Sequence, residues 1–402
     1  MTKTVVILGA MDTKGEDFGY LKDLIEAHGV KTLVVDFGVM GMGALKADIS
    51  AEEIAAAGDG DLAYFRTGAH KDEAMAIMAR GAALIARRLY DEGRLDGIIS
   101  MGGSGNTSVA AAAMRALPVG VPKVMVSTLA GGDMSAYTGM KDITFMPSIV
   151  DVSGLNRISK RIYANAAGAI AGMVKTEIPR DTAERPLIVA SMFGNTTVAV
   201  NRAKQHLEAA GYEVLVFHAT GTGGRAMEGL ISDGYIVGSL DMTTTELADE
   251  VCGGVFSAGA DRGLAASRAG IPAVIVPGCV DMANFHGIET VPEKYKDRNL
   301  YAWNPNVTLM RTNAEENRRI GEMLAAAANA SSAPVEFVLP LRGVSMLDSE
   351  GQRFYDPAAD RACFEAIKAN VRRGIAVHEV DHNINDAEFA DFCAARMIDL
   401  LR

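Results

Sequence analysis

Cysteine is scarce in this chain, with four residues among 402. They lie far apart, and no two of them form a Cys-x-x-Cys pair. The sequence therefore offers neither the ligand spacing of a zinc site nor a disulfide framework. A protein without disulfides fits a reducing compartment such as the cytosol. The four residues are Cys252, Cys279, Cys363 and Cys393.

Long apolar runs and clusters of basic residues are also lacking. The longest apolar run, Ile162–Val174, is too short to span a bilayer, and no charged leader with a cleavage site precedes the first run, TVVILGA. Lysine and arginine number 39 against 50 acidic residues, which gives a net charge of −11. Nucleic acid or an anionic membrane would find few cationic contacts on such a chain. We therefore expect a cytoplasmic protein that binds neither.

Apolar β-branched runs alternate along the whole chain with Ala- and Leu-rich amphipathic segments. This alternation of strand and helix predicts the α/β class, with mostly parallel sheets covered by helices on both faces. Ser50 and Glu53 have the spacing of a capping box, which predicts a short helix after Ser50. Strands are expected near Val5–Leu8, Lys31–Val35, Gly97–Ser100, Lys123–Ser127, Leu187–Ser191, Glu213–His218, Ala273–Val276, Val307–Met310 and Val335–Leu339.

A polar segment with two prolines, Thr176–Pro186, interrupts this periodicity near the middle of the chain. A chain of this length is long enough for two domains of roughly 200 residues each. We therefore predict an N-terminal domain over residues 1–180 and a C-terminal domain over 185–402, the second repeating the plan of the first.

The most informative segment follows the expected strand at Gly97–Ser100. Its glycines allow the backbone to approach a ligand closely, and the free N–H groups at the start of the next helix favour an anion. The loop matches neither Walker A nor Gly-x-Gly-x-x-Gly, so a tight turn without a ligand is the alternative. We expect a phosphate or nucleotide site formed by Gly102, Gly103, Ser104, Gly105, Asn106 and Thr107.

Polar loops follow the other strands of the first half, where ligands bind in open parallel sheets. Asp12, Thr13 and Lys14 offer a carboxylate, a hydroxyl and an ammonium suited to Mg²⁺ and phosphate, or else the cap of a helix. Asp36 ends the second strand, a position that often contacts a ribose hydroxyl. The loop after the fourth strand adds hydroxyls, glycines and a carboxylate: Ser127, Thr128, Gly131, Gly132 and Asp133.

The second half has similar loops. A second anionic group is expected at Asn195, Thr196, Gly221, Thr222, Gly223, Gly224 and Arg225, the last with a guanidinium that can hold a carboxylate or phosphate. The preferred interpretation of the segment from Asp241 to Glu246 is a helix cap, in which Thr243 faces Glu246. The alternative is a ligand-binding loop. Cys279, Asp281 and His286 follow another strand, where such residues can serve as nucleophile, metal ligand or base, and Asp281 is a candidate base. Cys279 is interpreted as a small buried residue in preference to a nucleophile.

His378–His382 spells His-Glu-x-x-His, which binds zinc only when a helix places both histidines on one face. The residues Ile375–Val380 alternate as in a strand, so this geometry is not expected and we exclude a zinc protease.

Several long motifs resemble the UPF0261 family, also called Tm-1-like ATP-binding domain proteins. They are LGAMDTKGED, MGGSGNTSVA, STLAGGD, MPSIVDVSGLNRIS, FHATGTGGRAME and PGCVDMANF, which together extend over nearly the whole chain. The resemblance implies two Rossmann-like subdomains, self-association as a homodimer, and ATP bound by the N-terminal subdomain on the loops at Asp12–Lys14, Gly102–Thr107 and Ser127–Asp133. In the plant member this domain binds a viral replication protein, and several plant-type members carry a further C-terminal domain that resembles a TIM-barrel enzyme.

Residues and resemblance together lead to one main hypothesis, a cytoplasmic ATP-binding protein with Mg²⁺ near Asp12 or Asp133. It would be an ATP-dependent enzyme if a small acidic metabolite occupied the cleft between the domains, with Asp133, Asp241 or Asp281 as the base. A module that binds a protein partner in an ATP-gated manner without turnover is one alternative. A nucleotide-sugar enzyme is the other.

Overall fold

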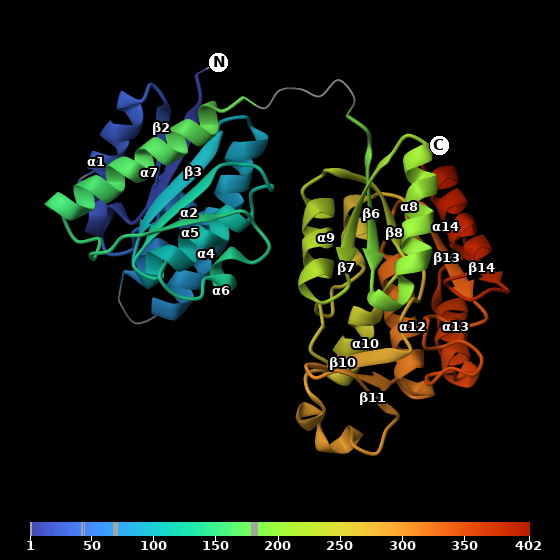
Figure 1. Ribbon diagram of the computed structural model, residues 1–402. Helices are drawn as coiled ribbons and strands as arrows, with labels where there is room; N and C mark the ends of the chain where they lie inside the picture. The colour runs from blue at the N-terminus through green and yellow to red at the C-terminus, as the bar shows by residue number, and fades with distance from the viewer. Residues whose placement is uncertain (1, 42, 44, 67–70, 178–183) are drawn as a thin grey trace. The chain divides into compact units, whose positions relative to one another are not determined.

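The computed structural model describes residues 2–41, 43, 45–66, 71–177 and 184–402, and the chain divides into two compact units, Met1–Arg180 and Asp181–Arg402 (Figure 1). Most of the polar segment Thr176–Pro186 lies outside the described residues. The two units are called the N-terminal unit and the C-terminal unit below.

The N-terminal unit is built on a sheet of five parallel strands in the order β2-β1-β3-β4-β5. Its inner strands are buried on both faces, as their continuous apolar runs require. The strands are β1 (Thr4–Gly9), β2 (Lys31–Asp36), β3 (Gly97–Gly102), β4 (Lys123–Ser127) and β5 (Thr144–Pro147).

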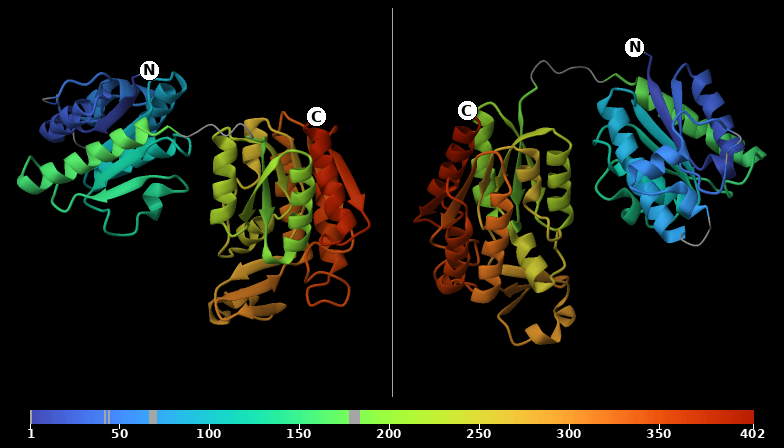
Figure 2. Two further views of the ribbon diagram at one scale, coloured as in Figure 1. Left: turned by 45° about the horizontal axis from the view of Figure 1, so that its top comes forward. Right: turned by 180° about the vertical axis from the view of Figure 1, so that it is seen from behind.

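Two helix layers cover this sheet (Figure 2). One face packs against α1 (Met11–Ala27) and α7 (Arg157–Lys175), whose apolar residues meet Val5, Ile7 and Ile99. The other face packs against α2 (Ala51–Ala57), α4 (Lys71–Asp91) and α5 (Ser104–Arg115). Two single-turn helices, α3 (Leu62–Phe65) and α6 (Ser135–Thr138), lie in connections. The predicted capping box at Ser50 and Glu53 is confirmed at the start of α2.

The C-terminal unit has a sheet of six parallel strands in the order β14-β13-β9-β8-β6-β7. Its first five strands along the chain have the same spatial order as the five strands of the N-terminal unit. The strands are β6 (Leu187–Met192), β7 (Glu213–His218), β8 (Ile236–Asp241), β9 (Ala273–Ile275), β13 (Val335–Pro340) and β14 (Ala376–Val380).

Helices cover both faces of this sheet as well. Helices α8 (Thr197–Ala209) and α14 (Ala387–Leu400) share one core cluster and pack on one face. The opposite face carries α9 (Thr222–Ser232), α10 (Thr245–Cys252), α11 (Leu264–Ala269), α12 (Ala314–Asn329) and α13 (Pro357–Asn370). Both units are thus Rossmann-like, as predicted, and the α/β class is confirmed.

The C-terminal unit also has a small antiparallel sheet that the sequence analysis did not predict. Its order is β10-β12-β11, formed by β10 (Met282–Phe285), β11 (Leu300–Asn304) and β12 (Val307–Arg311). The expected strand at Val307–Met310 exists, but it pairs here and not in the parallel sheet. Alternation alone does not reveal which partner a short strand chooses.

The His-Glu-x-x-His segment lies on strand β14 and the turn after it, so the exclusion of a zinc protease is supported. His378 Nε2 lies 2.9 Å from Glu336 Oε2 on the neighbouring strand. Within the described part of the chain, no helix is long and apolar enough to cross a membrane.

Candidate functional site

A cavity of about 450 Å³ lies at the carboxyl edge of the N-terminal sheet. Strands β1 and β3 are neighbours there, and the helices that follow them, α1 and α5, cover opposite faces. In open α/β sheets this topological switch point leaves a crevice where ligands bind. The wall is formed by Ala10, Asp12, Thr13, Phe37, Gly38, Val39, Met40, Phe65, Ala74, Met75, Gly105 and Asn106.

The glycine-rich loop brings the start of α5 to this cavity. Strand β3 ends at Gly102, where a Cβ atom would lie 2.5 Å from the Cβ of Asn106, so only glycine fits. Gly103 stands at the N-cap position, and no described side chain caps the helix. A helix of twelve residues whose first turn is uncapped presents N–H groups and positive dipole charge to a ligand.

The start of α1 is arranged differently because a protein carboxylate caps it. Asp36 Oδ1 accepts hydrogen bonds from the N–H groups of Met11 (2.9 Å) and Gly38 (2.8 Å). Burial raises the pKa of Asp36 above its usual value, against the lowering effect of these two bonds. Asp36 therefore ties the loops after β1 and β2 together, and α5 is left as the open helix end.

Asp12 is the carboxylate on the cavity wall. Its Oδ2 accepts from the N–H of Met40 at 2.7 Å, whereas its Oδ1 is buried and has no hydrogen-bond partner among the described residues. A Cβ at Gly38 would lie 2.5 Å from the Asp12 Cγ, so glycine at 38 makes room for this carboxylate. A buried oxygen without a partner is costly unless a ligand or ion satisfies it.

Apart from Asp12, Thr13, Gly105 and Asn106, the residues expected at the nucleotide site do not line the cavity. The Lys14 ammonium donates to the carbonyl of Val152, and Lys14 is the residue at which α1 kinks. Thr107 and Ser127 are buried, with their hydroxyl oxygens 2.8 Å apart. The remaining members lie at two connections of the chain. Gly102 ends β3, Gly103 follows it and Ser104 begins α5, while the exposed Thr128, Gly131, Gly132 and Asp133 follow β4.

Asp133 in particular is exposed and accepts from the Ser135 N–H at 2.9 Å. This bond lowers the pKa of Asp133 below its usual value. It is a turn-stabilising contact, and Asp133 does not line the cavity that Asp12 lines.

The sequence analysis missed the apolar part of the cavity. Phe37, Val39 and Met40 come from the loop after β2, Phe65 from α3 and Met75 from α4. In the sequence, FGVM directly follows Asp36 at the carboxyl end of a strand, which places these residues at the ligand edge of the sheet but does not distinguish a cavity wall from core.

In the C-terminal unit, the glycine turn after β7 is occupied by a protein carboxylate. Glu246 Oε1 accepts from the N–H groups of Gly221 (2.7 Å) and Gly224 (3.1 Å), and its side chain is fully buried. Arg225 donates to the carbonyl of Ser257. The expected anion site at Gly221–Arg225 thus has an anion from within the chain.

The cap predicted between Thr243 and Glu246 is wrong. Helix α10 begins at Thr245 and has no side-chain cap. Thr243 instead makes a 2.8 Å hydroxyl contact with Thr196, which is buried. Glu246 is drawn away by an ion pair with Arg262, with Nε 2.6 Å from Oε2.

Arg262 also binds Asp241, the first of the two candidate bases in this unit. Its Nη1 and Nη2 atoms donate to the two Asp241 oxygens at 2.6 and 2.8 Å, and Ser191 Oγ donates to Oδ1 at 2.6 Å. The Arg262 side chain is 1% exposed. Asp241 is thus held in a buried ion pair.

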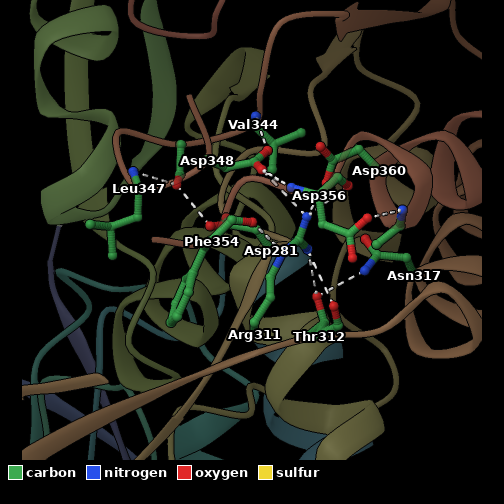
Figure 3. Close-up of polar contacts among 12 residues, drawn as sticks. Asp281, Arg311, Thr312, Asn317, Val344, Leu347, Asp348, Phe354, Asp356 and Asp360 are labelled. Carbon is green, nitrogen blue, oxygen red and sulfur yellow. Dashed lines mark hydrogen bonds and ion pairs between the residues drawn. The ribbon is translucent and has the colours of Figure 1, made fainter. Parts of the chain in front are cut away.

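Asp281, the second of these candidates, belongs to a buried cluster of three carboxylates around Arg311 (Figure 3). Arg311 Nη2 lies 2.7 Å from Asp360 Oδ1 and 3.4 Å from Asp348 Oδ1. Ser345 Oγ donates to Asp281 Oδ2 at 2.8 Å. Burial, with the charge of Asp348 adding to it, raises the pKa of Asp281 to about 7 and that of Asp360 to about 9.

Cys279 lies next to this cluster, fully buried in the turn after β9. Burial raises the pKa of its thiol well above the usual value, so the thiol stays protonated and is a poor nucleophile. Among the residues that the structure describes, no group of three or more His, Cys, Asp or Glu side chains is arranged to hold a metal ion.

The solved structures that are similar to this chain include distant likenesses. The crystal structure of UDP-GlcNAc 2-epimerase from Neisseria meningitidis bound to UDP-GlcNAc aligns with 68% of this chain and 82% of that one, at 8% sequence identity and a TM-score of 0.25. A likeness at this level says nothing about ligands.

Comparison with sequences is far more specific. The chain is 51% identical over 402 residues to a UPF0261 protein of Clostridium tetani (strain Massachusetts / E88), covering 100% of both. It is 41% identical over 325 residues to the ToMV resistance protein Tm-1(GCR237) of Solanum lycopersicum, covering 79% of this chain and 43% of that protein. Residues 3–179 match the model of the "Uncharacterised protein family (UPF0261) N-terminal domain", and residues 185–401 match that of its C-terminal domain. The chain belongs to the UPF0261 family.

Proposed function

We propose that the N-terminal unit binds ATP in the cavity between Asp12 and the start of α5. The observation that carries the proposal is the uncapped first turn of α5 at the wall of a 450 Å³ cavity, at the switch point of a parallel sheet. Ligand sites of this kind typically measure about 300–1,000 Å³ and combine apolar walls with a few polar groups. The family resemblance, which implies ATP for this unit, supports the same ligand.

The wall is divided in a way that suits a nucleotide. Phe37, Val39, Phe65 and Met75 form an apolar part that can take a planar base. Gly105 and Asn106, in the first turn of α5, form the part that can take phosphate oxygens through N–H groups.

Mg²⁺ fits the carboxylate of this cavity. Asp12 Oδ1 lacks a partner among the described residues, and Mg²⁺ is bound in proteins by one or two carboxylates together with substrate phosphates. Without a cation, the charge of Asp12 would oppose a triphosphate at the same wall. We therefore assign Mg²⁺ to Asp12 and not to the exposed Asp133; bound there, the ion would neutralise phosphate charge.

Isothermal titration calorimetry with ATP, ADP and UDP-glucose in the presence of Mg²⁺ tests this function. The decisive variant is Gly105→Asp, which adds a carboxylate where phosphate is expected. Of the described residues, a Cβ at 105 would meet only the flexible end of Met75, at 3.4 Å. We expect ATP affinity to fall by about tenfold or more, because like charges would oppose each other at the helix end. Gly19→Asp is the matched control, since a Cβ there has nothing within 4 Å and Gly19 lies outside the cavity wall.

ATP binding by the parent protein and by Gly19→Asp, but not by Gly105→Asp, is the expected result. Equal ATP affinity in both variants would show that ATP does not bind at the start of α5. Preference for UDP-glucose over ATP would favour the nucleotide-sugar alternative. Phosphate release measured on the same samples separates an ATP-dependent enzyme from a module that binds ATP without turnover.

A further inference from the structure

A second cavity, of about 270 Å³, lies at the carboxyl edge of the sheet in the C-terminal unit. Its wall includes Phe193 and Asn195 directly after β6, His218 at the end of β7, and Trp303 on β11. Strands β6 and β8 are neighbours, and the helices after them, α8 and α10, cover opposite faces. The turn after β6 is therefore at the switch point of this sheet, where ligands are expected.

The wall of this cavity is rich in aromatic side chains and has no permanently charged one among the described residues. The rings of Phe193 and Phe256 meet edge to face with centroids 6.3 Å apart, and the Trp303 side chain is partly exposed beside them. The described residues that form the wall include no lysine, arginine, aspartate or glutamate. Among the described residues of the wall, a charged metabolite would find no permanently charged counter-ion, whereas a neutral planar ring would find aromatic edges and faces.

Asn195 supplies a polar group without a partner. Its residue is 3% exposed, its Nδ2 lies 3.3 Å from the sulfur of Met282, and its Oδ1 has no hydrogen-bond partner in the part of the chain that the structure describes. The backbone carbonyl of Asn195 accepts from Asn385 Nδ2 (2.9 Å) and from the Met346 N–H (3.2 Å), which fixes its position. A ligand N–H or O–H that reached Oδ1 would remove the cost of a buried unmet acceptor.

We propose that this cavity, named here the ring pocket, binds a neutral small molecule with one aromatic ring and a hydrogen-bond donor. An apolar cavity of roughly 150 Å³ holds benzene. The ring pocket, at about 270 Å³, therefore has room for one ring with a substituent. The proposal concerns the C-terminal unit alone and does not depend on ATP binding in the N-terminal unit.

The only tryptophan of the chain, Trp303, stands in the ring pocket and reports binding directly. The probes are benzamide, nicotinamide and uracil, with cyclohexanecarboxamide, glucose and citrate as comparators. We expect at least one aromatic probe to change Trp303 emission saturably below about 10 mM. The saturated amide should bind about fivefold or more weakly, because it keeps the donor but loses the aromatic contacts.

Two variants and a control locate the binding. Asn195→Ala removes the acceptor that has no partner, and Phe256→Leu removes one aromatic ring. Each substitution should reduce the affinity for the aromatic probe about tenfold. Tyr355→Leu removes an exposed aromatic residue of the same unit outside the ring pocket and should change nothing. Far-UV circular dichroism checks that the variants are folded, and Phe256→Leu keeps the test valid if Asn195→Ala does not fold.

Three results would overturn the proposal. One is the absence of a saturable Trp303 response to all three aromatic probes in the folded protein. Another is unchanged affinity in both Asn195→Ala and Phe256→Leu. The third is tighter binding of glucose or citrate than of the aromatic probes, which would assign the pocket to a different ligand class.

Discussion

Replacement of Arg262 by methionine should destabilise the C-terminal unit severely. The guanidinium is 1% exposed and neutralises Asp241 and Glu246, whose side chains are 8% and 0% exposed, with Glu228 at 3.5 Å as a third, weaker contact. Arg262→Met leaves these carboxylates in the interior without a cation. Loss of one partner of a buried ion pair typically costs about 3–5 kcal/mol, and here two buried carboxylates lose the same partner. We therefore expect a loss of at least about 4 kcal/mol, a large part of the 5–15 kcal/mol of a typical domain.

Urea unfolding followed by Trp303 fluorescence measures this loss, because the only tryptophan lies in the C-terminal unit. With a slope of about 2 kcal/mol per molar urea, the midpoint should fall by about 2 M. Arg268→Met is the control: Arg268 pairs with Asp261 on the surface, with side chains 64% and 72% exposed, and its loss should cost less than about 1 kcal/mol.

A second substitution tests whether the unpaired buried carboxylates cause the loss of stability. Adding Glu246→Gln to Arg262→Met removes one uncompensated charge and keeps an oxygen that can accept from Gly221 and Gly224, so part of the stability should return. Equal midpoints for the Arg262 and Arg268 variants would refute the reasoning, as would further destabilisation of the double variant.

Two other predictions concern single carboxylates. The pKa of Asp281 is raised to about 7 in the folded protein, so the folded state keeps a proton that the unfolded chain loses near pH 4. The free energy of unfolding should therefore fall as the pH rises from about 4 to 7, by up to about 1.4 kcal/mol per pH unit. Urea unfolding at pH 5 and 7 measures this slope, which Asp281→Asn should flatten. A steeper or unchanged slope would contradict that assignment. Asp12→Asn should weaken ATP binding about tenfold in Mg²⁺ but hardly at all in EDTA, whereas Asp133→Asn should leave the ATP affinity unchanged in both. Calorimetry measures both affinities. A stronger effect at Asp133 than at Asp12 would place the ion on the loop after β4.

Periodicity was enough to predict the class and most of the elements. Continuous apolar runs are typical of strands buried on both faces. The run Val5–Leu8, for example, lies in strand β1. The capping box at Ser50 is local, so its chemistry is visible in four consecutive residues. The alternation at Ile375–Val380 likewise separated a strand from a zinc-binding helix.

Long-range pairing was not visible in the same way. Glu246 has the spacing of a helix cap relative to Thr243, but its partner Arg262 lies sixteen residues further along the chain. Leaving Arg262 buried without Glu246 would cost about 3–5 kcal/mol, more than the roughly 1 kcal/mol of a helix cap, so the long-range pairing decides where Glu246 lies. The same holds for the apolar wall at Phe37–Met40, since an apolar residue in a loop is as easily core as ligand site until the fold is known.

The two units share a strand order but treat the glycine-rich turn differently. At α5 no described side chain caps the first turn, so an anion bound there would come from solution, and its effect on stability would depend on its concentration, as RT ln(1 + [L]/Kd). At Gly221 and Gly224 the anion is Glu246, attached to the same chain and present in every molecule. Ligand should therefore raise the melting temperature of the N-terminal unit in proportion to the logarithm of the ligand concentration. The stabilising effect of Glu246 on the C-terminal turn, in contrast, does not depend on any ligand concentration.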